Sequence, residues 1–223
     1  MKISSFKKTA KQKLENNWGI AIGSMLLVVL ISSGAASVGQ FVLKSSPYLG
    51  AAFSFASLLV APIAIGYNRI HMDLSIDKVP QIETVFDGFK NGKFGNNFLA
   101  LLLVQLFVLF WCLLFIIPGI IKMFSYAMTP FILADPEYDG IQPVDAITKS
   151  REMMNGHKMD LFILILSFIG WIILIPLTFG LLFLYVGPYV QQATTEFYFE
   201  VKGGKPEETK VKMNTIDDDL VYQ

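Results

Sequence analysis

The chain has 223 residues, of which 53% are hydrophobic and only 16% are charged, and its mean hydropathy is positive. Soluble domains carry about 25% charged residues, so the composition indicates a polytopic membrane protein and excludes an ordinary soluble domain. The formal net charge of zero argues against nucleic acid as a partner. The single cysteine, Cys112, excludes an intrachain disulfide and a metal site built from paired cysteines.

Long apolar runs predict an all-α membrane helix bundle, because about 20 apolar residues span a bilayer as a helix. We expect about six transmembrane helices, at residues 19–43, 48–66, 98–117, 120–134, 161–175 and 181–201. Residues 1–201 would form a single membrane domain, and residues 202–223 a mobile charged cytosolic tail. The fourth run would extend only about 22 Å as a helix, so it is less tilted, flanked by a thinned bilayer, or re-entrant.

The first residues combine a cationic face with an apolar one. Five lysines fall within residues 2–15, while Ile3, Phe6, Ala10 and Leu14 recur at helical spacing on another face. We expect a basic amphipathic helix that lies on anionic lipid headgroups. The apolar run that follows exceeds the roughly 7–15 residues of a signal-peptide core, which predicts an uncleaved transmembrane helix.

Positive charge is distributed unevenly between the two sides of the predicted bundle. With six spans, all but two of the 18 lysines and arginines lie on the side of the termini and the long loops. The exceptions are Lys44 and Lys122. Such a bias marks the cytosolic side of a membrane protein. We therefore expect a multi-pass protein of the cell (plasma) membrane with both termini in the cytosol.

Three similar units follow one another along the chain. Each has an amphipathic segment, a break, a helix, an outer turn and a second helix that contains a proline. These prolines, Pro62, Pro130 and Pro188, are candidate helix kinks. The pattern predicts a threefold repeat of amphipathic helix plus transmembrane hairpin, although proline and glycine are also common in unrelated membrane helices. If the kinked helices face inward, they open a cavity toward the cytosol.

The last predicted span carries the candidate intramembrane polar site. Gln192 and Glu196 are four residues apart and therefore share a helix face, with Thr195 beside them. An ionisable group at membrane depth indicates a functional site.

Each of these polar residues also has a structural explanation. Glu196 lies near the inner interface, where an ordinary carboxylate would pair with Arg69 or Lys158. His71 and His157 lie just outside predicted spans and far apart in the sequence, so we expect interfacial histidines of no special role.

Arg151, His157 and Lys158 lie beside the fifth predicted span, at the cytosolic surface. They are candidate contacts for a lipid headgroup or a protein partner; alternatively, they are cationic anchors that fix the orientation. No enzyme motif or metal-spaced His/Cys cluster occurs, so no catalytic residue, metal or cofactor is assigned. The expected partners are membrane lipids and a protein on the cytosolic face.

Several short motifs resemble those of one bacterial membrane family. They lie at residues 117–122, 125–128, 135, 146–158, 168–171, 187–189 and 197–198. On these residues, nearly the whole chain resembles an integral-membrane family catalogued as domain of unknown function 975, which is common in Gram-positive bacteria. The resemblance implies a multi-helix cell-membrane protein without an established activity. A weaker likeness to the membrane domain of some glycerophosphodiester phosphodiesterases would imply a lipid-linked context.

These observations favour a non-enzymatic accessory or scaffold protein in envelope or lipid homeostasis. The alternative is a small transporter or channel with a cytosol-open cavity, and a third hypothesis is an intramembrane lipid-acting enzyme. The scarcity of charged residues deep in the predicted spans disfavours ion-coupled transport, and no set of catalytic residues can be assembled. The sequence does not indicate an oligomeric state.

Overall fold

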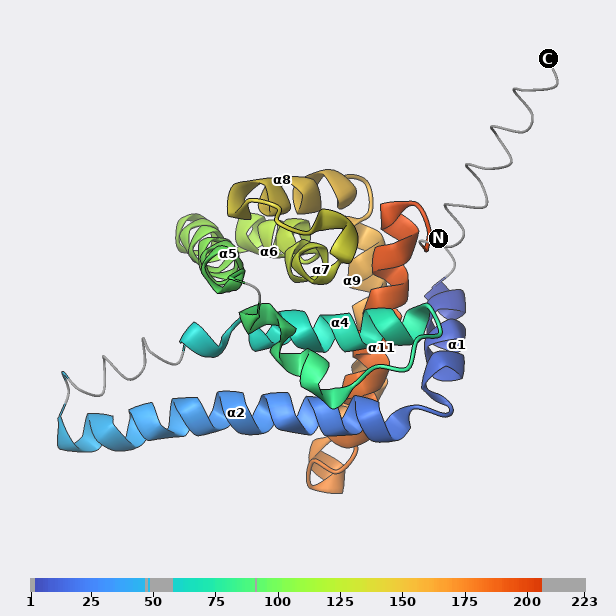
Figure 1. The fold of residues 1–223 in the computed structure, drawn as a ribbon, viewed down its shortest axis with the longest axis horizontal. Coiled ribbons are helices and arrows are strands. Elements are labelled where there is room, and N and C mark those ends of the chain that lie inside the picture. Colours follow the sequence, from blue (N-terminus) through green and yellow to red (C-terminus); the bar gives the residue numbers. More distant parts are fainter. Residues whose placement is uncertain (1–2, 47, 49–57, 91, 206–223) are drawn as a thin grey trace, which may run out of the picture.

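The computed structural model describes residues 3–46, 48, 58–90 and 92–205, and this part of the chain is all-helical (Figure 1). The predicted all-α class is therefore confirmed. The α-helices are α1 (Ile3–Leu14), α2 (Trp18–Ser45), α4 (Ile63–Ser75), α5 (Phe94–Leu114), α6 (Ile116–Tyr126), α7 (Thr129–Ala134), α8 (Pro143–Met153), α9 (Lys158–Leu166), α10 (Ile169–Leu174) and α11 (Phe183–Lys202). Short 3-10 segments are η1 (Leu58–Val60), η2 (Ile82–Phe89), η3 (Pro136–Tyr138) and η4 (Pro176–Thr178).

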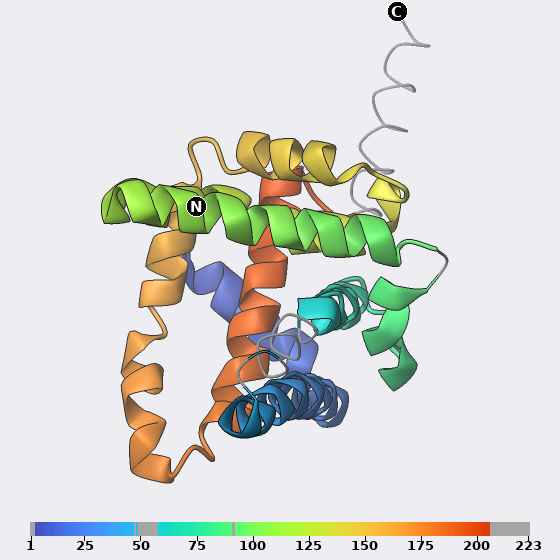
Figure 2. The ribbon, with the colours of Figure 1, turned by 90° about the vertical axis from the view of Figure 1, so that its left-hand side faces the viewer.

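The longer helices form three hairpins that point in different directions. The first pairs α2 with α4, the second pairs α5 with α6, and the third pairs α9 and α10 with α11. Helix α2 is seen from the side in Figure 1 and end-on in Figure 2, whereas α5 is seen end-on in Figure 1 and from the side in Figure 2. Helix α11 runs vertically in both views. The arrangement is thus not a bundle of parallel helices.

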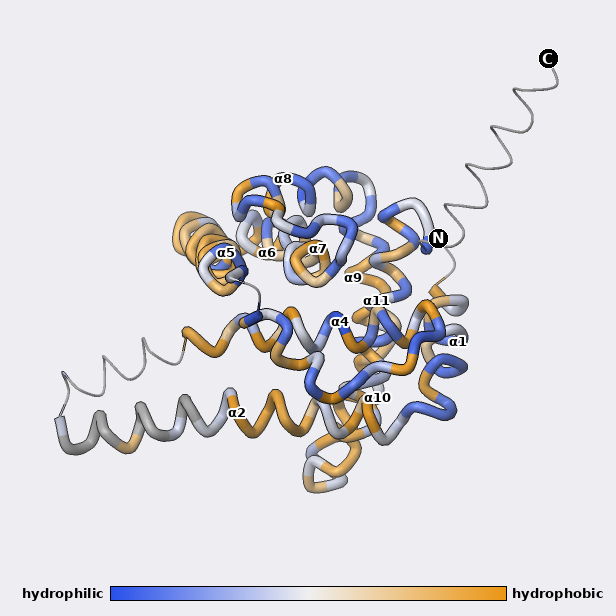
Figure 3. The backbone as a smooth tube through the Cα atoms, in the orientation of Figure 1, coloured by the Kyte–Doolittle hydropathy of each residue, from blue (hydrophilic) through white to orange (hydrophobic). Residues whose placement is uncertain are grey.

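The second and third hairpins carry exposed apolar surfaces that reach their tips. Figure 3 shows hydrophobic residues along α5, the first part of α2 and α10. Hydrophilic residues lie on α8 and on the connections between helices. Residues 113–117, at the tip of the α5–α6 hairpin, are all exposed. Phe179, at the tip of the third hairpin, is 98% exposed. Exposed apolar surface on this scale is typical of a face that contacts lipid or another protein.

Three described helical segments are long and apolar enough to cross a membrane: Phe94–Leu114, Ile116–Ala134 and Lys158–Thr178. A fourth is the bent pair Ile3–Leu14 and Trp18–Gly34, whose axes differ by 98°. Three to four candidate spans indicate a multi-pass membrane protein. Of the six predicted spans, 48–66 falls partly outside the described residues, and 181–201 corresponds to α11, which is too polar to qualify.

The hydrophobic core lies where α11 contacts α1, α2, α4 and α9. We call this region, where the three hairpins meet, the base. The apolar face of the first amphipathic helix, α1, packs against protein, and the contact of its cationic face with lipid headgroups stays a prediction. Phe6 is 7% exposed and meets Phe197 of α11 edge to face at 5.8 Å. An amphipathic pattern fits a lipid surface or a protein surface equally well, and here the aromatic face of α11 covers it.

The turn between α5 and α6 differs from the predicted break at Pro118. Helix α5 ends at Leu114 because Phe115 is extended, and Pro118 lies in the first turn of α6, where its missing N–H costs nothing. The two helices then approach closely at Gly119. A Cβ there would lie 2.3 Å from the Sγ of Cys112, so only glycine fits this contact without a shift.

Candidate functional site

Helix α11 buries several of its polar side chains. Gln192 and Thr195 have no exposed surface, and Glu196 is 6% exposed. Helix α11 continues through Pro188, although a proline cannot donate a backbone hydrogen bond. Buried polar groups need partners, since an unpaired one costs about 1–3 kcal/mol. The partners of this helix therefore define the site.

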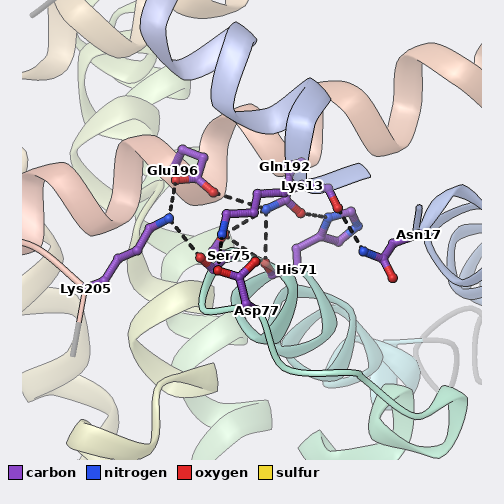
Figure 4. Close-up of polar contacts among 8 residues, drawn as sticks. All are labelled: Lys13, Asn17, His71, Ser75, Asp77, Gln192, Glu196 and Lys205. Atoms are coloured by element: carbon purple, nitrogen blue, oxygen red, sulfur yellow. Dashed lines mark hydrogen bonds and ion pairs between the residues drawn. The ribbon is translucent and has the colours of Figure 1, made fainter. Parts of the chain in front are cut away.

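Gln192 is the centre of a polar network between α11 and α4 (Figure 4). The Nδ1 atom of His71 lies 2.7 Å from Oε1 of Gln192. Because an amide oxygen only accepts, His71 carries its proton on Nδ1 and donates it. Nε2 of Gln192 donates to Oγ of Ser75 at 2.7 Å and to the carbonyl of His71 at 3.2 Å. The same nitrogen also reaches Oε1 of Glu196 at 3.4 Å.

Glu196 closes the other end of this network. Its Oε2 atom forms an ion pair with Nζ of Lys205 at 3.0 Å. The expected pairing with Arg69 or Lys158 is wrong, since Arg69 pairs with Asp73 at 3.3 Å and Lys158 lies elsewhere. Lys205 belongs to the predicted tail, which therefore begins as a packed segment; residues 206–223 lie outside the described part.

Thr195 does not take part in the network, although it was grouped with Gln192 and Glu196. Its hydroxyl donates to the carbonyl of Gln191, within its own helix, at 3.0 Å. Gln191 in turn donates to Asn68 of α4 at 2.5 Å. Among the described residues, Gln191 and Gln192 thus supply the hydrogen bonds from α11 to side chains of α4.

A second buried cluster joins the end of α11 to the segment after α7. Asp135 accepts a hydrogen bond from the hydroxyl of Tyr198 at 2.7 Å. It also forms an ion pair with Nζ of Lys202 at 2.5 Å. Lys202 also pairs with Glu137 at 2.6 Å. The side chains of Lys202 and Asp135 are only 5% and 4% exposed. Nothing in the sequence pattern indicates this cluster, because the spacing of Tyr198 and Lys202 shows a shared helix face and not the partner of that face.

His71 was expected at an exposed interface, yet it is fully buried. Burial lowers the pKa of His71 to about 4, an effect that the hydrogen bond to Gln192 opposes. The neighbouring Asp73 has its pKa raised by burial, against the lowering effect of Arg69. At neutral pH His71 is therefore an uncharged donor on Nδ1, and its Nε2 atom has no hydrogen-bond partner among the described residues.

The structure separates the three predicted headgroup contacts. Arg151 and Lys158 line one pocket of about 380 Å³, together with Lys122 of α6. His157 is not in its lining; it pairs with Asp160 at 3.2 Å. The assignment of Lys122 to the opposite side of the membrane from Arg151 is therefore wrong, because one pocket cannot lie on both sides of a core about 30 Å thick.

The three prolines occupy different positions relative to their helices. Pro62 is buried and precedes α4, after a break that follows η1. Pro130 is half-buried in the first turn of α7, after a break that follows α6. Pro188 is buried inside the continuous helix α11. Within the residues that the structure describes, no group of three or more His, Cys, Asp or Glu side chains is placed to hold a metal ion.

Comparison with known proteins gives one family. The family model described as "Protein of unknown function (DUF975)" matches residues 1–126 and 113–205. No curated protein and no solved structure matches the chain. The weaker likeness to the membrane domain of glycerophosphodiester phosphodiesterases is not shown by these comparisons.

Acid should destabilise the protein through His71. Its folded pKa of about 4 lies below the roughly 6.5 of an unfolded histidine, so the unfolded state binds more protons between these values. The stabilisation is complete above about pH 6.5, and about 3 kcal/mol is lost as the pH falls to 4. We expect the melting temperature of the detergent-solubilised protein to fall less steeply with acid in His71→Asn. The matched control His157→Asn should keep the wild-type slope, and equal slopes for all three proteins would contradict this role.

The Lys202 ion pair should contribute far more stability than an exposed one. Lys202→Met leaves the buried carboxylate of Asp135 without its cation, a change that typically costs about 3–5 kcal/mol. Lys90→Met is the control, because the Lys90–Asp87 side chains are 51% and 42% exposed and such pairs contribute under about 1 kcal/mol. Thermal unfolding in detergent measures both. Similar melting temperatures for the two variants would show that the Asp135 cluster does not stabilise the base.

Proposed function

Because this chain belongs to the DUF975 family, whose function is unknown, we propose its role from the fold: it is a non-enzymatic protein of the plasma membrane. It acts as an accessory or scaffold in envelope or lipid homeostasis. The observation that carries this proposal is the closed polar network of α11, in which the polar groups that transport or catalysis would need are bound to one another.

The transporter alternative needs polar side chains that a solute can reach. Gln192 and Thr195, which would line its cavity, have no exposed surface. The carboxylate of Glu196 is held by Lys205 at 3.0 Å and by Gln192 at 3.4 Å. A solute would have to displace these contacts and leave buried groups without partners, which costs several kcal/mol. The network is therefore better suited to holding α4 and α11 together.

The apolar hairpins support insertion into a membrane. Only 11% of the most apolar part of α5 and 17% of that of Lys158–Thr178 is buried inside the protein. If each hairpin returns to the side of the membrane where it began, Ile3 and Lys205, the first and last described residues, lie on one side whether a given hairpin crosses the membrane or turns back within it. In the sequence, all lysines and arginines other than Lys44 and Lys122 fall in the first segment, the two long loops and the last segment, which supports a cytosolic base.

The six-span prediction requires that all three hairpins cross, and the position of Lys122 argues against a crossing by the second one. Lys122 shares a pocket with Arg151 of the polar helix α8 and lies over the ring of Trp111 at 5.0 Å. From Lys122 to the tip at Phe115 a helix advances only about 10 Å, a third of the hydrocarbon core. Charges are costly at membrane depth, so we place the pocket at the cytosolic interface and treat this hairpin as re-entrant.

A threefold repeat of surface segment plus hairpin fits the same arrangement. At two of the three predicted breaks, an asparagine amide donates to a carbonyl of the preceding segment: Asn17 to Lys13 at 3.0 Å and Asn97 to Gly88 at 2.8 Å. The third break has His157 bound to Asp160 instead. In such a repeat, the three units would share a helical hairpin but differ in the hydrogen bonds at the break that precedes it.

Cysteine labelling tests the topology. In a Cys112→Ala background, we expect a membrane-impermeant maleimide to label Leu177→Cys on intact cells. It should label Asn155→Cys only after permeabilisation, and it should not reach Phe115→Cys from outside. Labelling of Phe115→Cys as strong as that of Leu177→Cys would show that the second hairpin crosses, and labelling of Asn155→Cys on intact cells would overturn the cytosolic base.

Two measurements separate a scaffold from a transporter. Native mass spectrometry of the protein, purified gently from its own membranes, should show a partner protein at fixed stoichiometry. Proteoliposomes should show no more solute flux than empty liposomes, and Gln192→Leu should not change it. A lone protein with flux that Gln192→Leu abolishes would overturn the scaffold proposal. Turnover of added lipids that is absent without the protein would favour the enzyme hypothesis.

A further inference from the structure

The pocket that contains Lys122 concentrates positive charge from three separate elements. Lys122 comes from α6, Arg151 from α8 and Lys158 from the first turn of α9. The remaining lining residues are Ser125, Thr148, Glu152 and Asn155. Three cations face one carboxylate, so the pocket has an excess of positive charge. We refer to these seven residues as the cationic pocket.

Within the part of the chain that the structure describes, none of the three cations forms an ion pair. Across the described residues, no carboxylate oxygen lies within 4.0 Å of Lys122, Arg151 or Lys158. The cations elsewhere at the base differ in this respect, since Lys202 and Lys205 each have a carboxylate at 3.0 Å or less. Bringing like charges together is unfavourable unless an anion joins them.

The geometry of the pocket is fixed by contacts that do not use its cations. The hydroxyl of Ser150 donates to the carbonyl of Ser125 at 3.0 Å, which holds α8 against α6. Phe124 of α6 meets Phe162 of α9 edge to face at 5.8 Å. The hydroxyl of Thr148 and the amide of Asn155 then add neutral donors to a preformed set of charged ones. We propose that the cationic pocket binds a phosphate group, carried by an anionic lipid headgroup or free in the cytosol.

The surroundings of the pocket are those of a lipid headgroup site. Ile121 and Met123, on either side of Lys122, are each 49% exposed, and Met159 beside Lys158 is 64% exposed. Acyl chains would lie over these apolar residues while the phosphate contacts the cations. A guanidinium fork and ammonium groups suit phosphate oxygens, and basic pockets on the cytosolic side of membrane helices bind such headgroups. This site goes beyond the scaffold role and does not require a protein partner.

The test titrates the purified full-length protein in mild detergent and counts bound molecules by native mass spectrometry. The probes are phosphatidylglycerol, diacylglycerol with the same acyl chains, and inorganic phosphate. The pocket variant carries Lys122→Gln, Arg151→Gln and Lys158→Gln. The matched control removes the same charge from exposed lysines outside the pocket, with Lys8→Gln, Lys11→Gln and Lys78→Gln.

We expect the wild-type protein and the control to bind phosphatidylglycerol at least about tenfold more tightly than diacylglycerol, and the pocket variant to lose this preference. Binding of inorganic phosphate that depends on the pocket in the same way, without binding of phosphatidylglycerol, identifies free phosphate as the source. Equal affinities of the pocket variant and the control for both phosphate ligands overturn the proposal. This result leaves the scaffold role standing, because that role rests on partner and flux measurements.

Two single substitutions keep the test valid if the triple variant does not fold. Arg151 and Glu152 are both exposed, so their replacement should not disturb packing. Arg151→Gln should weaken phosphatidylglycerol binding several-fold. Glu152→Gln should strengthen it, because it removes the carboxylate from the pocket lining. Unchanged affinity in both single variants overturns the proposal.

Discussion

The fold depends on one constraint: α11 buries polar side chains, and each of them needs a partner from another element. Its hydrogen bonds reach in three directions. Tyr189 donates to the carbonyl of Lys7 in α1, Gln192 binds α4, and Lys202 binds the segment after α7. An apolar helix in the same place would pack in several rotations at similar free energy, whereas misplaced polar groups each cost about 1–3 kcal/mol. These bonds therefore fix how the three hairpins meet at their common base, although the hairpins differ in direction.

Local features of the sequence predicted the helical class and the hairpin units, because they depend on residues close together in the chain. Apolar runs and the breaks between them can be identified from residues that are close together in the sequence. Contacts between distant elements could not be predicted in this way. To predict the pairing of Glu196 with Lys205, one would need to know that the start of the tail folds back. To predict the burial of His71, one would need to know that its face of α4 packs against α11. Periodicity shows which residues share a face, but it does not show what covers that face.

The position of Lys122 illustrates the same limit with a larger consequence. Counting spans placed this lysine on the outer side, because each apolar run was taken to cross the membrane. The structure puts it beside Arg151 of α8, so the α5–α6 hairpin extends only a short way beyond a polar helix. Hydropathy reports whether a segment tolerates lipid, and it does not report how deep the segment lies. The charges packed beside the hairpin supply that information.

The free-energy cost of placing a charge in hydrocarbon constrains where the cations of this protein can lie. Cations at the base with carboxylate partners, such as Lys202 and Lys205, are held within the protein, where ion pairs offset their desolvation. The cations of the cationic pocket have no carboxylate partner among the described residues, and exposed apolar residues lie beside them in the sequence. Under the proposal made above, these cations bind phosphate at the level of the membrane where lipid phosphates lie, beside the exposed apolar surface of the hairpins.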